Sequence, residues 1–201
     1  MKYILVFVCA LLPIITLSQS LHYDTLLIPK RTALMLTTDS LFVNHFIMGD
    51  SSTIILGAQT TLIKTFRLEA GVNCSIIGDG MDAIIMKDNS LPLSLQQAVR
   101  GENGKSLTLI STIFDTKSIL SIYLNGGNGS DGGLFALPGE GGAGGNLFFI
   151  SSYSEKKKVD QQINLKNEGG YPGRPRHSAA GMEASSLPTR KKGDFRIIAN
   201  K

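Results

Sequence analysis

The sequence contains no tryptophan and two cysteines, Cys9 and Cys74. We expect Cys9 to be removed with the N-terminal apolar run, which leaves a single cysteine and no means of forming an internal disulfide. This argues against a small disulfide-stapled extracellular module and favours a secreted bacterial protein. Cys74 lies in the strand-like run VNCSII, and this position predicts a buried thiol.

No apolar run in the sequence has the length that a membrane-spanning helix needs, which is roughly 20 residues. The longest extends from Tyr3 to Leu17, follows a single Lys and ends in small polar residues. These are the three regions of a secretory signal peptide, and we expect cleavage close to Ser18, which gives a signal peptide over residues 1–18. The expected location is secreted, extracellular or on the cell surface, with the periplasm as an alternative, and no transmembrane segment after cleavage.

Residues 19–105 lack a convincing helical period over most of their length and form a β-rich N-terminal region. Short β-prone runs alternate there with turns of Gly, Asp, Asn, Ser and Pro, which predicts an all-β fold. The short turns favour a β-solenoid of the parallel β-helix type, whose rungs stack on one another. A β-sandwich is the alternative. The expected strands are Thr25–Ile28, Ala33–Leu36, Leu41–Ile47, Thr53–Leu56, Thr61–Leu68, Cys74–Ile77 and Ala83–Met86.

One segment of this region reads differently. We interpret Leu93–Arg100 as a short helix or a loop; Pro92 before it and Gly101 after it suit a helix.

Glycine is abundant and concentrated: it occupies half of residues 126–145. Several of these glycines are three residues apart, as in Gly139, Gly142 and Gly145. Collagen is rejected because the phase slips across LFALP and the triplets are few. Two readings remain open, a mobile loop and an ordered packing of extended chains with three residues per turn. GGNGSDGGL also partly fits a calcium-binding nonapeptide with Asp131 as ligand, but Gly133 stands where a large apolar residue is required, so Asp131 is a weak metal candidate.

Residues 106–201 contain two strand–loop–strand units, with a Gly-rich loop at 125–146 and a basic loop at 169–193, continuous with the N-terminal region. The alignment equates Ile122-Tyr123-Leu124 with Ile163-Asn164-Leu165, and Gly126-Gly127 with Gly169-Gly170. It also equates residues 146–150 with residues 194–198. Two such units would project two long loops from one side.

With a β-rich region followed by strand–loop units and GGxGGxGG-like loops, the chain resembles Gly-rich secreted bacterial surface proteins, often labelled collagen-like. The resemblance covers roughly Thr25 to the C-terminus. It implies a β-solenoid-like surface protein and brings no particular reaction with it.

Positive charge gathers at the C-terminal end. Residues 151–201 hold eleven Lys and Arg against five Asp and Glu, a net charge of +6, whereas residues 1–150 carry −2. Such patches attract acidic polysaccharide, nucleic acid or anionic lipid, and a simply solvated surface is the alternative. One exposed loop offers an aromatic ring, two guanidiniums and an imidazole that could grip acidic sugars or phosphates. These candidate ligand-binding residues are Tyr171, Arg174, Arg176 and His177.

Catalytic patterns are sparse. The sequence has no HExxH, no GxSxG and no phosphate-binding loop, so nucleotide binding is unsupported and no cofactor is expected. A polysaccharide lyase could use Asp79, Asp82 and Asp88 with Lys87, although GDGMDA is more simply a turn between rungs. The sequence therefore favours a non-catalytic structural or adhesive protein that contacts polysaccharide or cell-surface components. A β-helix carbohydrate-active enzyme, either a lyase or a hydrolase, is the alternative.

Overall fold

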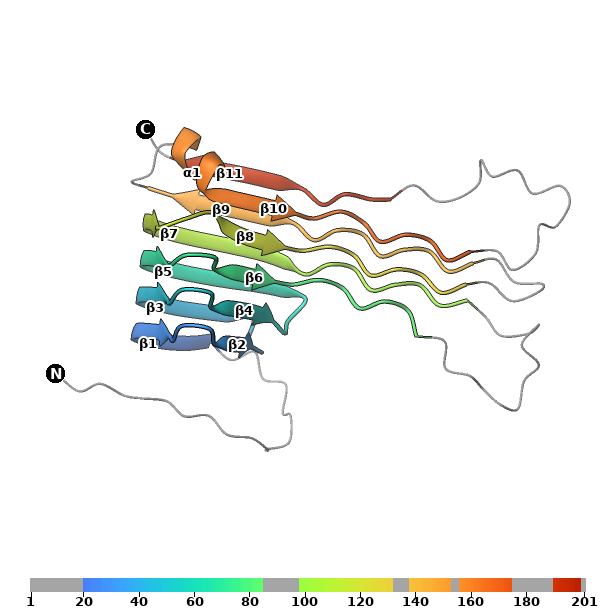
Figure 1. Ribbon diagram of the computed structural model, residues 1–201, viewed down its shortest axis with the longest axis horizontal. Helices are drawn as coiled ribbons and strands as arrows, with labels where there is room; N and C mark the ends of the chain where they lie inside the picture. Colours follow the sequence, from blue (N-terminus) through green and yellow to red (C-terminus); the bar gives the residue numbers. More distant parts are fainter. Residues whose placement is uncertain (1–19, 85–97, 132–137, 153–155, 175–189, 200–201) are drawn as a thin grey trace, which may run out of the picture.

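The computed structural model describes residues 20–84, 98–131, 138–152, 156–174 and 190–199, which form two stacked parallel β-sheets (Figure 1). The six-stranded sheet has the order β1-β3-β5-β7-β9-β11, and the five-stranded sheet has the order β10-β8-β6-β4-β2. Every strand pairing among these residues is parallel. The strands of the larger sheet are β1 (Ser20–Ile28), β3 (Ser40–Met48), β5 (Thr60–Ala70), β7 (Ser106–Thr116), β9 (Leu147–Ser151) and β11 (Phe195–Ala199); those of the smaller sheet are β2 (Ala33–Leu36), β4 (Thr53–Leu56), β6 (Ser75–Ile77), β8 (Leu120–Tyr123) and β10 (Ile163–Lys166).

The core lies between the two sheets and is built from columns of apolar side chains. Because side chains alternate between the two faces of a strand, every second residue points inward. The parallel register then stacks equivalent positions, so that Leu41, Ile63, Leu109 and Phe149 form one buried column. Burial of each such side chain contributes about 1.5–3 kcal/mol to folding. The all-β prediction is confirmed.

The turn between the long strand and the following short one repeats in the first three layers. Arg31, Ser51 and Asn73 all have positive φ, at 55°, 58° and 55°. Main-chain hydrogen bonds join the layers, from Arg31 N–H to Asp50 O (2.9 Å) and from Ser51 N–H to Val72 O (2.7 Å). The same local conformation therefore recurs between the long and the short strand of these layers and keeps the layers in register.

An exposed ion pair joins two of these turns, with Lys30 Nζ 2.8 Å from Asp50 Oδ2. The hydrogen bond from Lys30 lowers the pKa of Asp50, and the same contact raises the pKa of Lys30.

Cys74 is buried, as the sequence predicts. Its Sγ lies 3.2 Å from Gly49 O and 3.7 Å from Ser52 Oγ in the preceding layer. The thiol thus packs inside the turn stack.

Four expected strands exist but are longer or shorter than predicted, while Ala33–Leu36 and Thr53–Leu56 match the structure at both ends. The strand predicted at Ala83–Met86 is wrong where it can be seen, because residues 83–84 are not in a strand; residues 85–86 lie outside the described residues. Of the two readings of Leu93–Arg100, a short helix or a loop, residues 98–100 fit the loop, because they are non-helical and hydrogen-bond to other segments; the rest of the stretch lies outside the described residues.

In the described part of the chain a helix forms at α1 (Lys156–Gln162), which contacts β10 and β11. Its sequence KKKVDQQ contains one apolar residue, the fully buried Val159, so no helical period could reveal it. Within the described part of the chain, no helix is long and apolar enough to cross a membrane.

One half of the predicted repeat alignment needs correction. The equivalence of residues 146–150 with 194–198 is confirmed by the pairing of β9 with β11. In the other half, however, Ile163 pairs with Leu120 and Leu165 pairs with Ile122, so the predicted strand alignment is displaced by two residues. The apolar alternation of the two strands fits either register, since a shift of two residues keeps every side chain on its face.

Candidate functional site

The distinctive feature of the molecule is a set of six extended segments that continue from the two sheets. The first two connections from the smaller sheet back to the larger sheet are short: residues 37–39 join β2 to β3, and residues 57–59 join β4 to β5. The next three such connections are long excursions that leave the smaller sheet and return to the larger one (Figure 1). The described parts of these excursions, here called the glycine bundle, are residues 78–84, 98–105, 124–131, 138–146, 167–174 and 190–194.

The segments of the glycine bundle are joined by main-chain hydrogen bonds at intervals of three residues. Segment 138–146 donates to segment 124–131 from Gly139, Gly142 and Gly145, with N···O distances of 2.7–2.8 Å. Segment 124–131 in turn donates to two others, from Gly126 and Gly129 to segment 167–174 and from Gly127 and Ser130 to segment 98–105. Each segment therefore bonds in several directions, which matches an extended helix of three residues per turn rather than a flat strand.

This packing explains the three-residue glycine spacing. A Cβ added at Gly142 would collide with the main chain of Glu102, and one at Gly127 would collide with that of Met81, both well under 3.0 Å. Gly145 faces Lys105 O in the same way. Of the two open readings, the described residues 126–131 and 138–145 show the ordered packing of extended chains.

Asp and Asn side chains link the segments further. In an arrangement we call the Asx clamp, the side chain of an Asp or Asn and the main-chain N–H of the next residue together bind both main-chain groups of a single residue on the neighbouring segment. Asn128 Oδ1 accepts from Tyr171 N–H at 2.8 Å, while the N–H of Gly129, the next residue, donates to Tyr171 O at 2.8 Å. The same geometry occurs at Asp79, Asp82, Asn103, Asn125, Asn128 and Asn146.

The clamps form rows across the bundle. Asp79 holds Asn125, whose own side chain holds Glu168; Asp82 holds Asn128, which holds Tyr171. The sequence carried a signal for these rows, because Asp79 and Asp82, like Asn125 and Asn128, are three residues apart. The partners of each clamp, however, are 40 or more residues away in the chain and were not foreseeable.

We expect Asn128→Ala to lower the free energy of unfolding by about 1 kcal/mol, because Tyr171 N–H loses its acceptor. Amide hydrogen exchange should show faster exchange at Tyr171. Asn44→Ala is the matched control, since Asn44 makes an exposed side-chain contact to Asp24 on the larger sheet, and its effect should stay within about 0.5 kcal/mol. Unchanged protection of Tyr171 in Asn128→Ala would contradict the clamp.

Two of the predicted ligand-binding residues lie on the glycine bundle. Tyr171 is 59% exposed, and Arg174 donates its main-chain N–H to Asp131 Oδ1 at 2.8 Å. Both sit on segment 167–174 with their side chains at the surface. Arg176 and His177 lie outside the described residues.

Sequence reasoning missed Arg190, which organises this surface. Its guanidinium carbon lies 4.0 Å from the centre of the Tyr171 ring. The same side chain donates to Glu168 Oε2 at 2.8 Å and to Gly169 O at 2.8 Å. Because Arg190 is distant from Tyr171 in sequence, no local pattern joins them.

The acidic candidates are tied into the bundle. Asp79 Oδ1 accepts from both the main-chain N and Nδ2 of Asn125, and Asp82 Oδ1 accepts from Asn128 N. Asp88 and Lys87 lie outside the described residues. Asp131 serves as an acceptor for Arg174, and no group of three or more His, Cys, Asp or Glu placed to hold a metal ion occurs in the described ranges.

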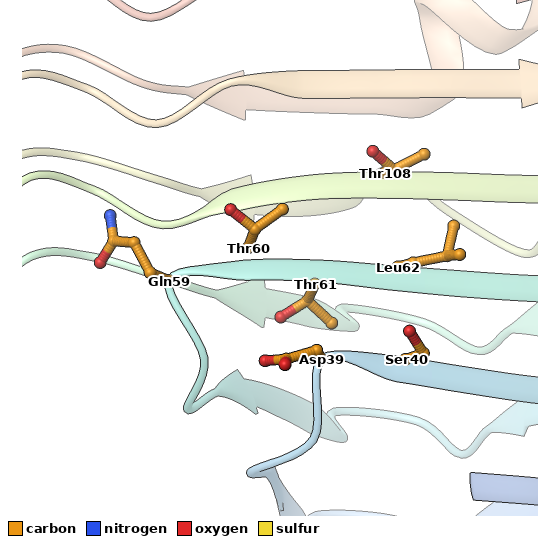
Figure 2. Close-up of a pocket in the computed structure, with 7 residues that line it drawn as sticks. All are labelled: Asp39, Ser40, Gln59, Thr60, Thr61, Leu62 and Thr108. Carbon is orange, nitrogen blue, oxygen red and sulfur yellow. The ribbon is translucent and has the colours of Figure 1, made fainter. Parts of the chain in front are cut away.

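One recess, about 560 Å³, lies beside the short connections that precede β3 and β5. Figure 2 shows its lining side chains, four of which carry hydroxyls and one an amide, with Asp39 as the one acid among the described lining residues. Glycosidase chemistry requires two carboxylates across a cleft, and the described lining of this recess supplies one. The lining residues are Asp39, Ser40, Gln59, Thr60, Thr61, Leu62 and Thr108.

The second recess, about 390 Å³, lies over the turn that holds the Lys30–Asp50 ion pair.

Comparison of the chain with protein-family models, with curated proteins and with solved structures finds no match.

Proposed function

We propose that this is a non-catalytic secreted or cell-surface protein with a structural or adhesive role, in which a short β-solenoid carries the glycine bundle as a stiff projection. The observation that carries the proposal is the continuity of main-chain hydrogen bonding from the sheets into the bundle, as between Leu124 N–H and Lys166 O at 2.7 Å. A set of chains bonded in several directions resists bending more than a single loop does. Such a projection can hold a contact surface away from the sheets.

The solenoid part of the proposal rests on the regular advance of the layers. Ser20, Ser40 and Leu62 occupy the same position in consecutive layers. Five layers contribute one long and one short strand in the same order, and the first three repeat the same turn between them. Stacked units that bury their apolar face only against their neighbours are typical of solenoids.

For the contact surface we propose the exposed side chains of Tyr171 and Arg174, with Arg190 beside them. An aromatic ring can stack against a sugar, and guanidinium groups bind carboxylates or sulfates through paired hydrogen bonds. Lys191 and Lys192 add positive charge and are exposed. An acidic polysaccharide fits this combination. Residues 1–18 are proposed to direct export, and the N-terminal sequence of the exported protein would test that.

A glycan array that includes uronic-acid and sulfated polymers tests the proposal. We expect binding to acidic polymers, weakened about tenfold in a Tyr171→Ala, Arg174→Ala double variant, equivalent to about 1.4 kcal/mol. Lys64→Ala is the matched control, because Lys64 is an exposed cation on β5. The absence of binding to every acidic polymer on the array would contradict the adhesive proposal.

The enzyme alternative gives a separate outcome. Cleavage of a uronic-acid polymer that disappears in Asp79→Ala or Asp82→Ala would replace the non-catalytic proposal with a lyase. The hydrogen bonds of both carboxylates to main-chain N–H groups favour a structural role for them.

A further inference from the structure

Three of the Asx clamps are asparagines followed by glycine: Asn103-Gly104, Asn125-Gly126 and Asn128-Gly129. In such pairs the main-chain nitrogen of glycine can attack the asparagine side chain, because glycine has no Cβ to obstruct the approach. A bond forms between this nitrogen and Cγ of asparagine, and ammonia leaves. Water then opens the resulting five-membered imide at either carbonyl and yields aspartate or isoaspartate, with no oxidant or reductant involved.

In the folded protein both reacting groups are held by a neighbouring segment. Gly126 N–H donates to Glu168 O at 2.9 Å, and Asn125 Oδ1 accepts from Glu168 N–H at 3.2 Å. The attacking nitrogen is thus engaged with another acceptor, and the side chain that it would attack is turned toward a different residue.

The other two pairs repeat this geometry. Asn128 and Gly129 grip Tyr171, with both distances at 2.8 Å. Asn103 and Gly104 grip Ala143, at 2.9 and 2.8 Å. In all three pairs the glycine N–H and the asparagine Oδ1 are therefore engaged in the hydrogen bonds that hold the bundle together.

We propose that Asn103, Asn125 and Asn128 are self-modification sites that the Asx clamps keep unreactive, so that opening of the glycine bundle converts them irreversibly to aspartate and isoaspartate. At Asn125 the conversion opposes reclosure for a structural reason. Asn125 Nδ2 donates to Asp79 Oδ1 at 3.0 Å, and a carboxylate in its place loses that donor and repels Asp79. Isoaspartate also lengthens the main chain and shifts the three-residue register.

The first test compares the folded full chain with the same chain unfolded in urea, at mildly alkaline pH. Peptide mapping by mass spectrometry follows the loss of amide at each asparagine. We expect at least about tenfold slower conversion of all three sites in the folded chain, because reaction requires local opening of the bundle. Equal rates in the two states would overturn the proposal.

The second test separates the clamp from general folding. Glu168→Pro removes the N–H that Asn125 accepts, and proline suits an extended segment. We expect at least threefold faster conversion of Asn125, with Asn103 unchanged because its clamp partner is Ala143. Glu168→Gln retains the N–H and should leave Asn125 at the wild-type rate. Equal acceleration of Asn103 and Asn125 in Glu168→Pro, or acceleration of Asn125 in Glu168→Gln, would overturn the role of the clamp.

Discussion

Gly142→Ala is expected to open the glycine bundle while leaving the two sheets folded. A Cβ at residue 142 would collide with Glu102 O and C, which are main-chain atoms and cannot move aside as a side-chain tip can. Gly142 also donates to Gly127 O and accepts from Gly170 N–H, both at 2.8 Å. Overpacking typically costs 1–3 kcal/mol and occasionally more, and we expect about 3 kcal/mol here.

Hydrogen exchange localises this effect. In Gly142→Ala, the amides of Gly127, Gly142 and Gly170 should lose protection, whereas those of β3 and β5 should keep it. Ala143→Gly is the matched control in the same segment: it adds no atoms and should cost only about 0.5–1 kcal/mol, from backbone entropy. Wild-type protection of the bundle in Gly142→Ala would show that the segments do not pack as closely as described.

Phe149→Ala is expected to lower the free energy of unfolding by about 3–5 kcal/mol. Phe149 lies on β9 with a fully buried side chain, and its ring packs edge-on against Phe114 with the centroids 5.1 Å apart. The residue also connects the core to the bundle, since segment 138–146 runs directly into β9. Removing the ring should therefore weaken the sheets and the bundle together.

Urea unfolding measures this loss, and Phe148→Ala is the control. Phe148 is the neighbouring residue on β9 and points outward, where Arg196 lies 5.9 Å from its ring centre. We expect an effect below about 1 kcal/mol for Phe148→Ala. If the two variants lost similar stability, β9 would not have the inward and outward faces assigned to it.

The strands were predictable where short-range signals were strong. Ala33–Leu36 and Thr53–Leu56 are short apolar runs bounded by turn residues, and both match the structure. The helix α1 was not predictable, because its single apolar residue Val159 becomes informative only when β10 and β11 lie beside it. The register of β8 against β10 was misjudged because alternation alone accepts a shift of two residues.

The candidate contact surface was likewise predictable from the sequence only in part. Tyr171 and Arg174 could be named from the residue types in one loop, but Arg190 joins Tyr171 only through contact across the bundle. Asp79 and Asp82 looked like potential catalytic acids in sequence, and the structure places them as acceptors for main-chain N–H groups. Residue type alone cannot distinguish a catalytic Asp79 or Asp82 from a structural one, because the structural role of each depends on a partner 46 residues away.

The sequence by itself determined the all-β class, the burial of Cys74 and the three-residue spacing of the glycines, because each follows from the pattern of neighbouring residues. Only the tertiary structure decided what that spacing is for. Gly127, Gly142 and Gly145 are required because the main chain of another segment occupies the space where a Cβ would lie. Which segments meet is set by the stacking of the two sheets, which brings the three excursions out side by side.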